Sequence, residues 1–91
     1  MALPVDQLLL EEYEDYLMIQ RRLSQATLSV YLYEVSRLLE TALPLETVDA
    51  TQLETYLIGE RKERNLSPAS LAKALSALRS FFSFLQLQKI R

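Results

Sequence analysis

Apolar residues recur along this chain at intervals of three and four positions, the spacing that places them on one face of an α-helix. The pattern occupies four stretches, over residues 6–22, 24–42, 49–65 and 67–85. No stretch shows the strict alternation of apolar and polar residues that is typical of a half-buried β-strand. The single glycine leaves little material for tight hairpin turns. The sequence therefore predicts an all-α fold.

Helix-capping signals open the last three stretches. Ser24, Asp49 and Ser67 stand where a side-chain oxygen can accept a hydrogen bond from the first helical turn. An apolar residue stands directly before each of these caps, and a second apolar residue stands four positions after the cap. This is the spacing of a hydrophobic staple. Gln52 follows Asp49 at the spacing of a capping box, and Pro68 takes the first helical position, which suits proline. These signals fix where three of the helices begin.

The remaining helix ends are less strongly marked. Asp6 is the expected N-cap of the first helix, which should run to about Arg22. Pro44 is expected to end the second helix, because proline cannot continue it. Asn65 suits the left-handed position after the third helix, since asparagine accepts that conformation.

Short connections between the stretches predict two helical hairpins, joined by a loop over residues 43–48, in one domain that spans residues 1–91. The letters LSQATL at residues 23–28 echo LSPASL at residues 66–71. Either an internal repeat or a shared capping pattern explains this echo. Tyr13, Tyr16, Tyr31 and Tyr56 are expected in the core. The fourth helix is expected to bury Leu71, Ala74, Leu75, Leu78, Phe81, Phe82 and Leu85.

Composition excludes most catalytic chemistry. The chain has no histidine and no cysteine, so it lacks the imidazole base, thiolate nucleophiles and the common soft metal ligands. Glu11, Glu12, Glu14 and Asp15 could share a divalent ion, but such a run is more often a solvated helix face. We therefore expect no catalytic residue, no metal, no cofactor and no small-molecule substrate. Without a membrane-spanning run or a signal peptide, a cytoplasmic location is expected and no membrane partner.

Charge is distributed unevenly along the chain. The formal net charge is only −2. However, residues 1–60 carry eleven acidic and three basic side chains, whereas residues 61–91 carry one acidic and seven basic side chains. Such asymmetry indicates a partner bound in a definite orientation, although two solvated faces of opposite charge would give the same counts.

Two exposed helix faces carry residues suited to nucleic acid. On the fourth helix, Lys73 is expected to share an outer face with Ser70, Ser80, Ser83 and the small Ala77, with Arg79 on its flank. Small side chains allow a helix to approach DNA closely, while lysine and serine supply charge and hydrogen bonds. The second helix offers a polar outer side of Gln25, Thr27, Ser29, Tyr33, Ser36 and Arg37. An ordinary solvated surface would have the same composition.

Several motifs run in order along residues 8–85. They are Leu23-Ser24-x-x-Thr27-Leu28-x-x-Tyr31, Tyr56-Leu57, Leu66-Ser67-Pro68 and Leu75-Ser76-Ala77-Leu78-Arg79-Ser80-Phe81-Phe82. In these motifs the chain resembles the N-terminal core-binding domain of tyrosine recombinases, with the Xer-type recombinases and phage integrases as the closest group. Arg22 and Asn65 stand where that family commonly has glycine before the Leu-Ser pair.

The resemblance implies a four-helix, SAM-like bundle that clamps one side of double-stranded DNA, with its second and fourth helices facing the major groove. It also implies contacts with other recombinase protomers in a synaptic complex. The catalytic domain, which cleaves DNA through a tyrosine–phosphate linkage, is absent from residues 1–91. None of the tyrosines here is therefore expected to be the nucleophile.

These observations lead to one main hypothesis: the chain is the DNA-binding module of a site-specific tyrosine recombinase or integrase and is not itself an enzyme. Lys73 and Arg79 would supply charge, and Tyr33 would pack on the sugar–phosphate backbone. The remaining candidate contacts are Gln25, Thr27, Ser70 and Arg37. The alternative is a helical module that binds a protein partner through its acidic first helix and has no role at DNA.

Overall fold

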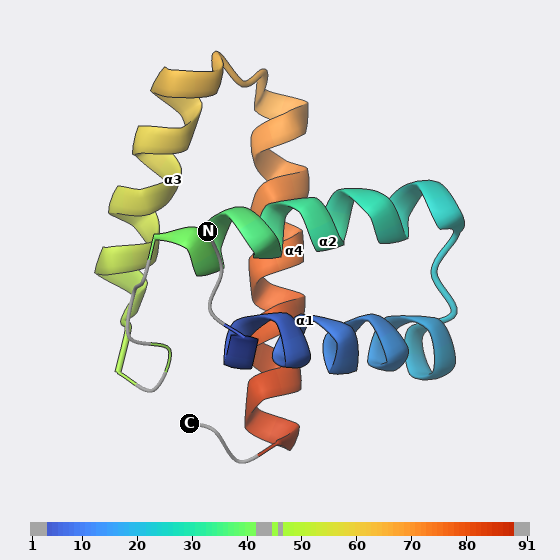
Figure 1. The fold of residues 1–91 in the computed structure, drawn as a ribbon. Coiled ribbons are helices and arrows are strands. Elements are labelled where there is room, and N and C mark those ends of the chain that lie inside the picture. Colours follow the sequence, from blue (N-terminus) through green and yellow to red (C-terminus); the bar gives the residue numbers. More distant parts are fainter. Residues whose placement is uncertain (1–3, 42–44, 46, 89–91) are drawn as a thin grey trace.

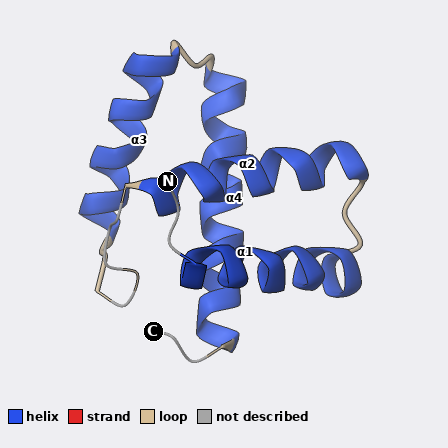
Figure 2. Ribbon diagram, in the orientation of Figure 1, coloured by secondary structure: helices blue, strands red, loops and turns tan. Residues whose placement is uncertain are grey.

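The computed structural model describes residues 4–41, 45 and 47–88. Its elements are α1 (Pro4–Tyr16), the π-helical turn η1 (Leu17–Arg21), α2 (Gln25–Glu40), α3 (Ala50–Arg64) and α4 (Pro68–Leu87). Helices account for nearly all of this part of the chain, and it contains no strand (Figure 2). The predicted all-α class is confirmed.

The four helices form two antiparallel hairpins that cross one another. In Figure 1, α1 and α2 run side by side as one hairpin, and α3 and α4 form the other. The main interface between the hairpins is formed by α2 and α4. In Figure 1, α1 crosses the C-terminal half of α4, while α3 ends beside the N-terminus of α4. The acidic first helix and the basic last turn of α3 therefore lie near different ends of α4.

An aromatic cluster holds α1 against α4. Tyr13, Phe81 and Phe84 are at most 1% exposed, and the Tyr13 ring centroid lies 5.1 Å from that of Phe81 and 5.4 Å from that of Phe84. The Tyr13 hydroxyl donates a hydrogen bond to Ser80 Oγ at 3.0 Å. Burial raises the pKa of Tyr13 to about 12, with the Ser80 hydrogen bond opposing the shift. The other predicted core tyrosines, Tyr16, Tyr31 and Tyr56, are half-buried at the edges of this core.

The predicted helix starts at Ser24, Asp49 and Ser67 are confirmed. Each of these side chains accepts a hydrogen bond from the backbone N–H three residues later. Asp49 and Gln52 form both halves of the capping box, at 2.8 and 2.9 Å. These contacts are local, so the sequence alone determines them.

The expectation for the start of the first helix is wrong. Helix α1 begins at Pro4, so Asp6 lies inside its first turn and is not the N-cap. A proline is favoured at the first helical position because its fixed φ suits the helix and its missing N–H is not needed there. The predicted end near Arg22 is confirmed, but the π-helical turn before it was not expected. Pro44, the expected end of the second helix, lies outside the described residues.

Among the described residues, two non-glycine residues adopt the left-handed conformation, one before each Leu-Ser pair. They are Arg22, with φ of 50°, and Asn65, with φ of 53°. The conformation predicted for Asn65 is confirmed. Arg22 occupies the same conformation with a side chain that disfavours it, because its Cβ crowds the following carbonyl oxygen.

Replacing Arg22 with glycine is expected to raise the free energy of unfolding by about 0.5–1 kcal/mol. Glycine removes the steric cost of the left-handed conformation, and the gain is reduced by its greater freedom in the unfolded chain. Urea denaturation followed by circular dichroism measures the change. Asn65→Gly is the matched control and should gain less, because asparagine tolerates this conformation. An equal or larger gain at Asn65 would contradict the explanation.

Candidate nucleic-acid interface

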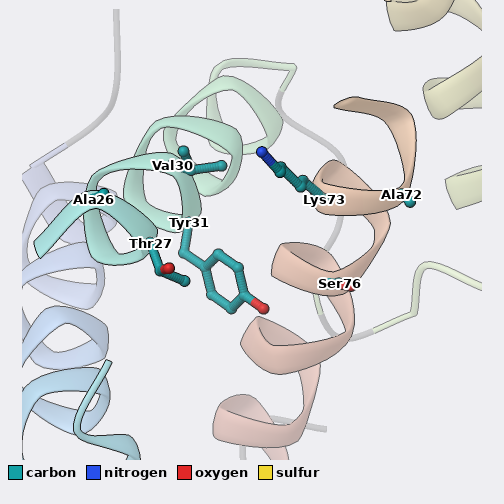
Figure 3. A pocket seen from close by; sticks show the side chains of 7 residues that line it. All are labelled: Ala26, Thr27, Val30, Tyr31, Ala72, Lys73 and Ser76. Carbon is teal, nitrogen blue, oxygen red and sulfur yellow. The ribbon is translucent and has the colours of Figure 1, made fainter. Parts of the chain in front are cut away.

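A groove separates the N-terminal halves of α2 and α4. It has a volume of about 310 Å³ and is lined by Ala26, Thr27, Val30, Tyr31, Ala72, Lys73 and Ser76. Lys73 extends from α4 toward α2, and the Tyr31 ring extends from α2 toward α4 (Figure 3). Two of the predicted DNA-contacting residues, Thr27 and Lys73, therefore come from different hairpins and meet at one groove.

The first turns of α2 and α4 hold similar pairs of hydroxyl groups, and Thr27 of the α2 pair lines the groove. Ser24 Oγ donates to Thr27 Oγ1 at 3.0 Å, and Ser67 Oγ donates to Ser70 Oγ at 3.1 Å. Both pairs are exposed at the first turn of a helix. Thr27 and Ser70 thus keep fixed positions while their hydroxyl groups can still form further hydrogen bonds.

Lys73 is the exposed cation of the groove. Three ion pairs form among the described side chains, and Lys73 belongs to none of them. Its ammonium group is therefore available to an external anion. The neighbouring Ala26 and Ala72 carry small side chains, which allow an extended ligand to come close to the backbones of both helices.

Arg37, another of the predicted residues, belongs to an ion-pair network between α2 and α3. Arg37 binds both carboxylate oxygens of Glu60, at 2.6 and 3.0 Å. Arg64 binds both oxygens of Glu34, at 2.8 and 2.9 Å, and reaches Glu60 at 3.0 Å. The two arginines and two glutamates balance in charge. The positive charge of Arg37 is therefore neutralised within the protein, and its guanidinium is only partly accessible.

The network also positions Tyr33. The Tyr33 ring is half exposed, as predicted, and the guanidinium carbons of Arg64 and Arg37 lie 5.2 and 5.9 Å from its centroid. Such cation–π contacts favour one orientation of the ring. Tyr33 thus presents an aromatic surface whose direction is set by residues of both α2 and α3.

Hydrogen bonds within the network shift the pKa values of Glu60, Arg37 and Arg64. Those from Arg37, and then Arg64, hold the pKa of the Glu60 carboxyl below its ordinary value, against the opposing effect of burial. The pKa values of both arginines are raised, chiefly by the hydrogen bonds to Glu60 and Glu34. Glu60, Arg37 and Arg64 are therefore charged at neutral pH.

The remaining predicted residues lie apart from the groove. Gln25 is exposed at the first position of α2. Arg79 is exposed on the opposite flank of α4, where it lines a separate hollow between α3 and α4 together with Leu53 and Leu75. The structure therefore does not bring Arg79 together with Lys73 and Thr27.

Two residues of the expected outer face of α4 point inward. Ala77 is fully buried, because α1 and α2 pack against this side of α4. Ser80 is half-buried and accepts the hydrogen bond from Tyr13. Conversely, Leu75, expected in the core, is 36% exposed beside α3. The buried face of α4 is thus rotated from the predicted stripe toward Ala77.

Sequence reasoning missed the roles of Arg64 and Glu34. A signal was present for Arg64, since it follows Glu60 by four positions on one helix and Glu60 falls at helical spacing from the apolar residues Tyr56 and Leu57. A carboxylate on such a face needs a cationic partner. No comparable signal identifies Glu34, which is 30 positions from Arg64.

No group of three acidic side chains among the described residues could hold a metal ion. No helix in residues 4–41 or 47–88 is long and apolar enough to cross a membrane.

Comparison with known proteins identifies the family. A sequence model described as "Phage integrase, N-terminal SAM-like domain" matches residues 10–89. The chain belongs to this family. As the sequence predicts, the match is to the N-terminal SAM-like domain and not to a catalytic domain. No solved structure matches the chain.

Relatives of this SAM-like domain include three tyrosine recombinases. The chain is 38% identical to a tyrosine recombinase of Pseudothermotoga lettingae, over 91% of this chain and 31% of the relative. It is 33% identical to tyrosine recombinase XerD of Vibrio cholerae, over 99% of this chain and 31% of the relative. It is 36% identical to tyrosine recombinase XerC of Yersinia pestis, over 88% of this chain and 28% of the relative. The SAM-like domain therefore spans less than a third of their length.

Proposed function

We propose that this chain is the DNA-binding module of a site-specific tyrosine recombinase, and that α2 and α4 contact double-stranded DNA on either side of their groove. The observation that carries the proposal is the groove itself, where Lys73 and Thr27 from two different hairpins converge in a domain of the recombinase family. Lys73 would neutralise a phosphate, while Thr27 and Ser70 would donate hydrogen bonds to the backbone or to base edges. Tyr33 would pack against a neighbouring sugar.

The candidate residues do not contribute equally under this proposal. Arg37 is neutralised by Glu60, so we expect it to add less to DNA affinity than Lys73. Arg79 and Gln25 lie outside the groove and would contact only DNA that extends past it. In a complete recombinase the module would clamp one side of the core site and assist contacts between protomers in the synaptic complex. Breaking and rejoining of DNA would belong to the rest of that protein.

Titration of the ¹⁵N-labelled chain with duplex DNA, followed by NMR, tests where DNA binds. We expect shifts that cluster in residues 24–37 and 68–76 and that weaken as salt is added, because phosphate contacts release counterions. Shifts confined to residues 11–15 when a protein partner is added, with none on adding DNA, would instead favour a protein-interaction module.

Lys73→Ala is expected to weaken DNA binding about equally for all sequences and to reduce the slope of log affinity against log salt by about one unit. The reason is the loss of one phosphate contact. Fluorescence anisotropy with labelled duplexes at several salt concentrations measures both quantities. Lys62→Ala is the matched control, since Lys62 is an exposed lysine on α3 outside the groove. Equal effects of the two substitutions would contradict the assignment of the groove.

A further inference from the structure

The groove between α2 and α4 has walls that are mostly apolar. Its lining includes Ala26, Val30 and the Tyr31 ring from α2, and Ala72 from α4. Val30 is half-buried, whereas Ala26 and Ala72 are exposed. Figure 3 shows Val30 extending from α2 toward Lys73 of α4. A ligand in this groove would therefore meet one branched apolar side chain, together with small residues and one cation.

The groove lacks the side chains that most often distinguish base pairs by hydrogen bonds. Arginine reads guanine, asparagine and glutamine read adenine, and carboxylates read cytosine. None of these residue types is among the described residues that line the groove. The hydroxyl groups of Thr27, Tyr31 and Ser76 can donate or accept, so they select no particular base. Lys73 could reach guanine or a phosphate, and the proposed function assigns it to a phosphate.

Apolar contact remains as a way in which this groove can read sequence. Thymine carries a C5-methyl group in the major groove, and no other unmodified DNA base has one. Burying that methyl group against an apolar side chain favours binding. The minor groove offers no such group, so the contact requires α2 and α4 to face the major groove.

We propose that Val30 is a specificity-determining residue that packs against thymine methyl groups, so that the groove favours A·T base pairs. Ala26 and Ala72 would let the edge of the base come close, and Lys73 would hold an adjacent phosphate. This preference rests on the proposed function, because it requires DNA in the groove between α2 and α4.

Deoxyuridine tests the role of the methyl group, because it differs from thymidine only in lacking that group. Two duplexes of one A·T-only sequence are compared by fluorescence anisotropy at a fixed salt concentration, one with thymidine and one with deoxyuridine throughout. The deoxyuridine duplex should bind about fourfold more weakly for each methyl group in contact, the effect of one buried CH₂ group. Equal affinities for the two duplexes would overturn the proposal.

5-Methylcytosine provides the reciprocal test. It places a methyl group at the corresponding position of a G·C pair, so a G·C-only duplex should bind more tightly when its cytosines are methylated. A preference set by the width of the minor groove should not follow these methyl groups, since they lie in the major groove. An A·T preference that responds to neither change would overturn the proposal and assign the selectivity to DNA shape.

Val30→Ala tests which residue makes the contact. This variant should bind the thymidine and deoxyuridine duplexes with nearly equal affinity, because its shorter side chain cannot reach the methyl group. Ile58→Ala is the matched control and should keep the difference, since Ile58 is a 51% exposed branched residue of α3 outside the groove. If circular dichroism shows that Val30→Ala is unfolded, Val30→Thr replaces only one methyl with a hydroxyl group and should reduce the difference. A full difference in a folded Val30 variant would overturn the assignment.

Lys73→Ala separates the thymine preference from DNA binding itself. Loss of the phosphate contact should weaken binding of both duplexes by the same factor and leave the ratio of their affinities unchanged. If neither duplex binds the unaltered chain, the proposed function and the preference both fail. If binding depends on Lys73 but thymidine and deoxyuridine duplexes bind equally, only the preference fails.

Discussion

Tyr13→Ala is expected to lower the free energy of unfolding by about 3–5 kcal/mol, as large-to-small substitutions of buried aromatic residues do. Tyr13 is fully buried and contacts Phe81 and Phe84 of α4. Its removal leaves a cavity between α1 and α4 and an unfilled hydrogen bond at Ser80. Domains of this length have stabilities of about 5–14 kcal/mol, so the variant should be close to unfolding. Urea denaturation followed by circular dichroism measures the change.

Tyr13→Phe is the matched control, because it keeps the ring and removes only the hydroxyl group. This variant should lower the free energy of unfolding by about 1 kcal/mol, the usual net contribution of one hydrogen bond. A loss as large as that of Tyr13→Ala would show that the hydroxyl, rather than ring packing, holds α1 in place.

Tyr13→Phe also tests how the stability of the domain depends on pH. The pKa of Tyr13 is raised to about 12 in the folded chain, whereas an unfolded tyrosine ionises near 10. Above pH 10 the unfolded chain therefore binds fewer protons than the folded one, and stability falls as pH rises from about 10 to 12. Tyr13→Phe should reduce this fall, although Tyr56, whose pKa is also raised by burial, still contributes. An unchanged alkaline profile would contradict the burial of the phenol.

Glu60→Gln is expected to lower the free energy of unfolding by about 2 kcal/mol. Breaking a fully buried ion pair usually costs 3–5 kcal/mol, but the Arg37 side chain is 31% exposed and water compensates part of the loss. The substitution weakens contacts with both Arg37 and Arg64 and leaves two cations facing one carboxylate, Glu34. Glu54→Gln, at an exposed position of the same helix, is the control and should be nearly neutral.

The free energy of unfolding at acid pH should depend on the same ion-pair network. The pKa of Glu60 is lowered in the folded chain, chiefly by hydrogen bonds from Arg37. Its contribution to stability is therefore present above the unfolded pKa of about 4.3 and is lost as pH falls through the lower folded value. Glu60→Gln should flatten the acid limb of the stability profile. It should also strengthen DNA binding, because Arg37 is no longer neutralised. A variant with unchanged acid sensitivity would show that the network is not held by Glu60.

The starts of α2, α3 and α4 could be predicted from the sequence because they depend on contacts within one turn. Ser24, Asp49 and Ser67 each bond to a backbone N–H three positions away. The left-handed conformation of Asn65 is also a local property. In all four cases the decisive partner is close in sequence, so no knowledge of the tertiary structure is needed.

Other features depend on how the hairpins pack, and no local pattern contains that information. Ala77 is buried because α1 and α2 cross α4 on its side, and Leu75 is left partly exposed beside α3. Arg37 was correctly placed on the outer part of α2, but its partner Glu60 lies 23 positions away. The pairing of Lys73 with Thr27 across the groove likewise depends on the crossing of two hairpins. The candidate residues could be chosen from the sequence, but their grouping could not.

The paired left-handed turns at Arg22 and Asn65 also bear on the order of folding. Each turn is followed by an extended serine N-cap with nearly the same dihedral angles, so each hairpin reverses direction through contacts of short sequence separation. Closing such short loops is fast and loses little chain entropy. We expect the docking of α2 on α4, which joins the two hairpins, to be the slower event. The groove between α2 and α4 is then expected to form late in folding.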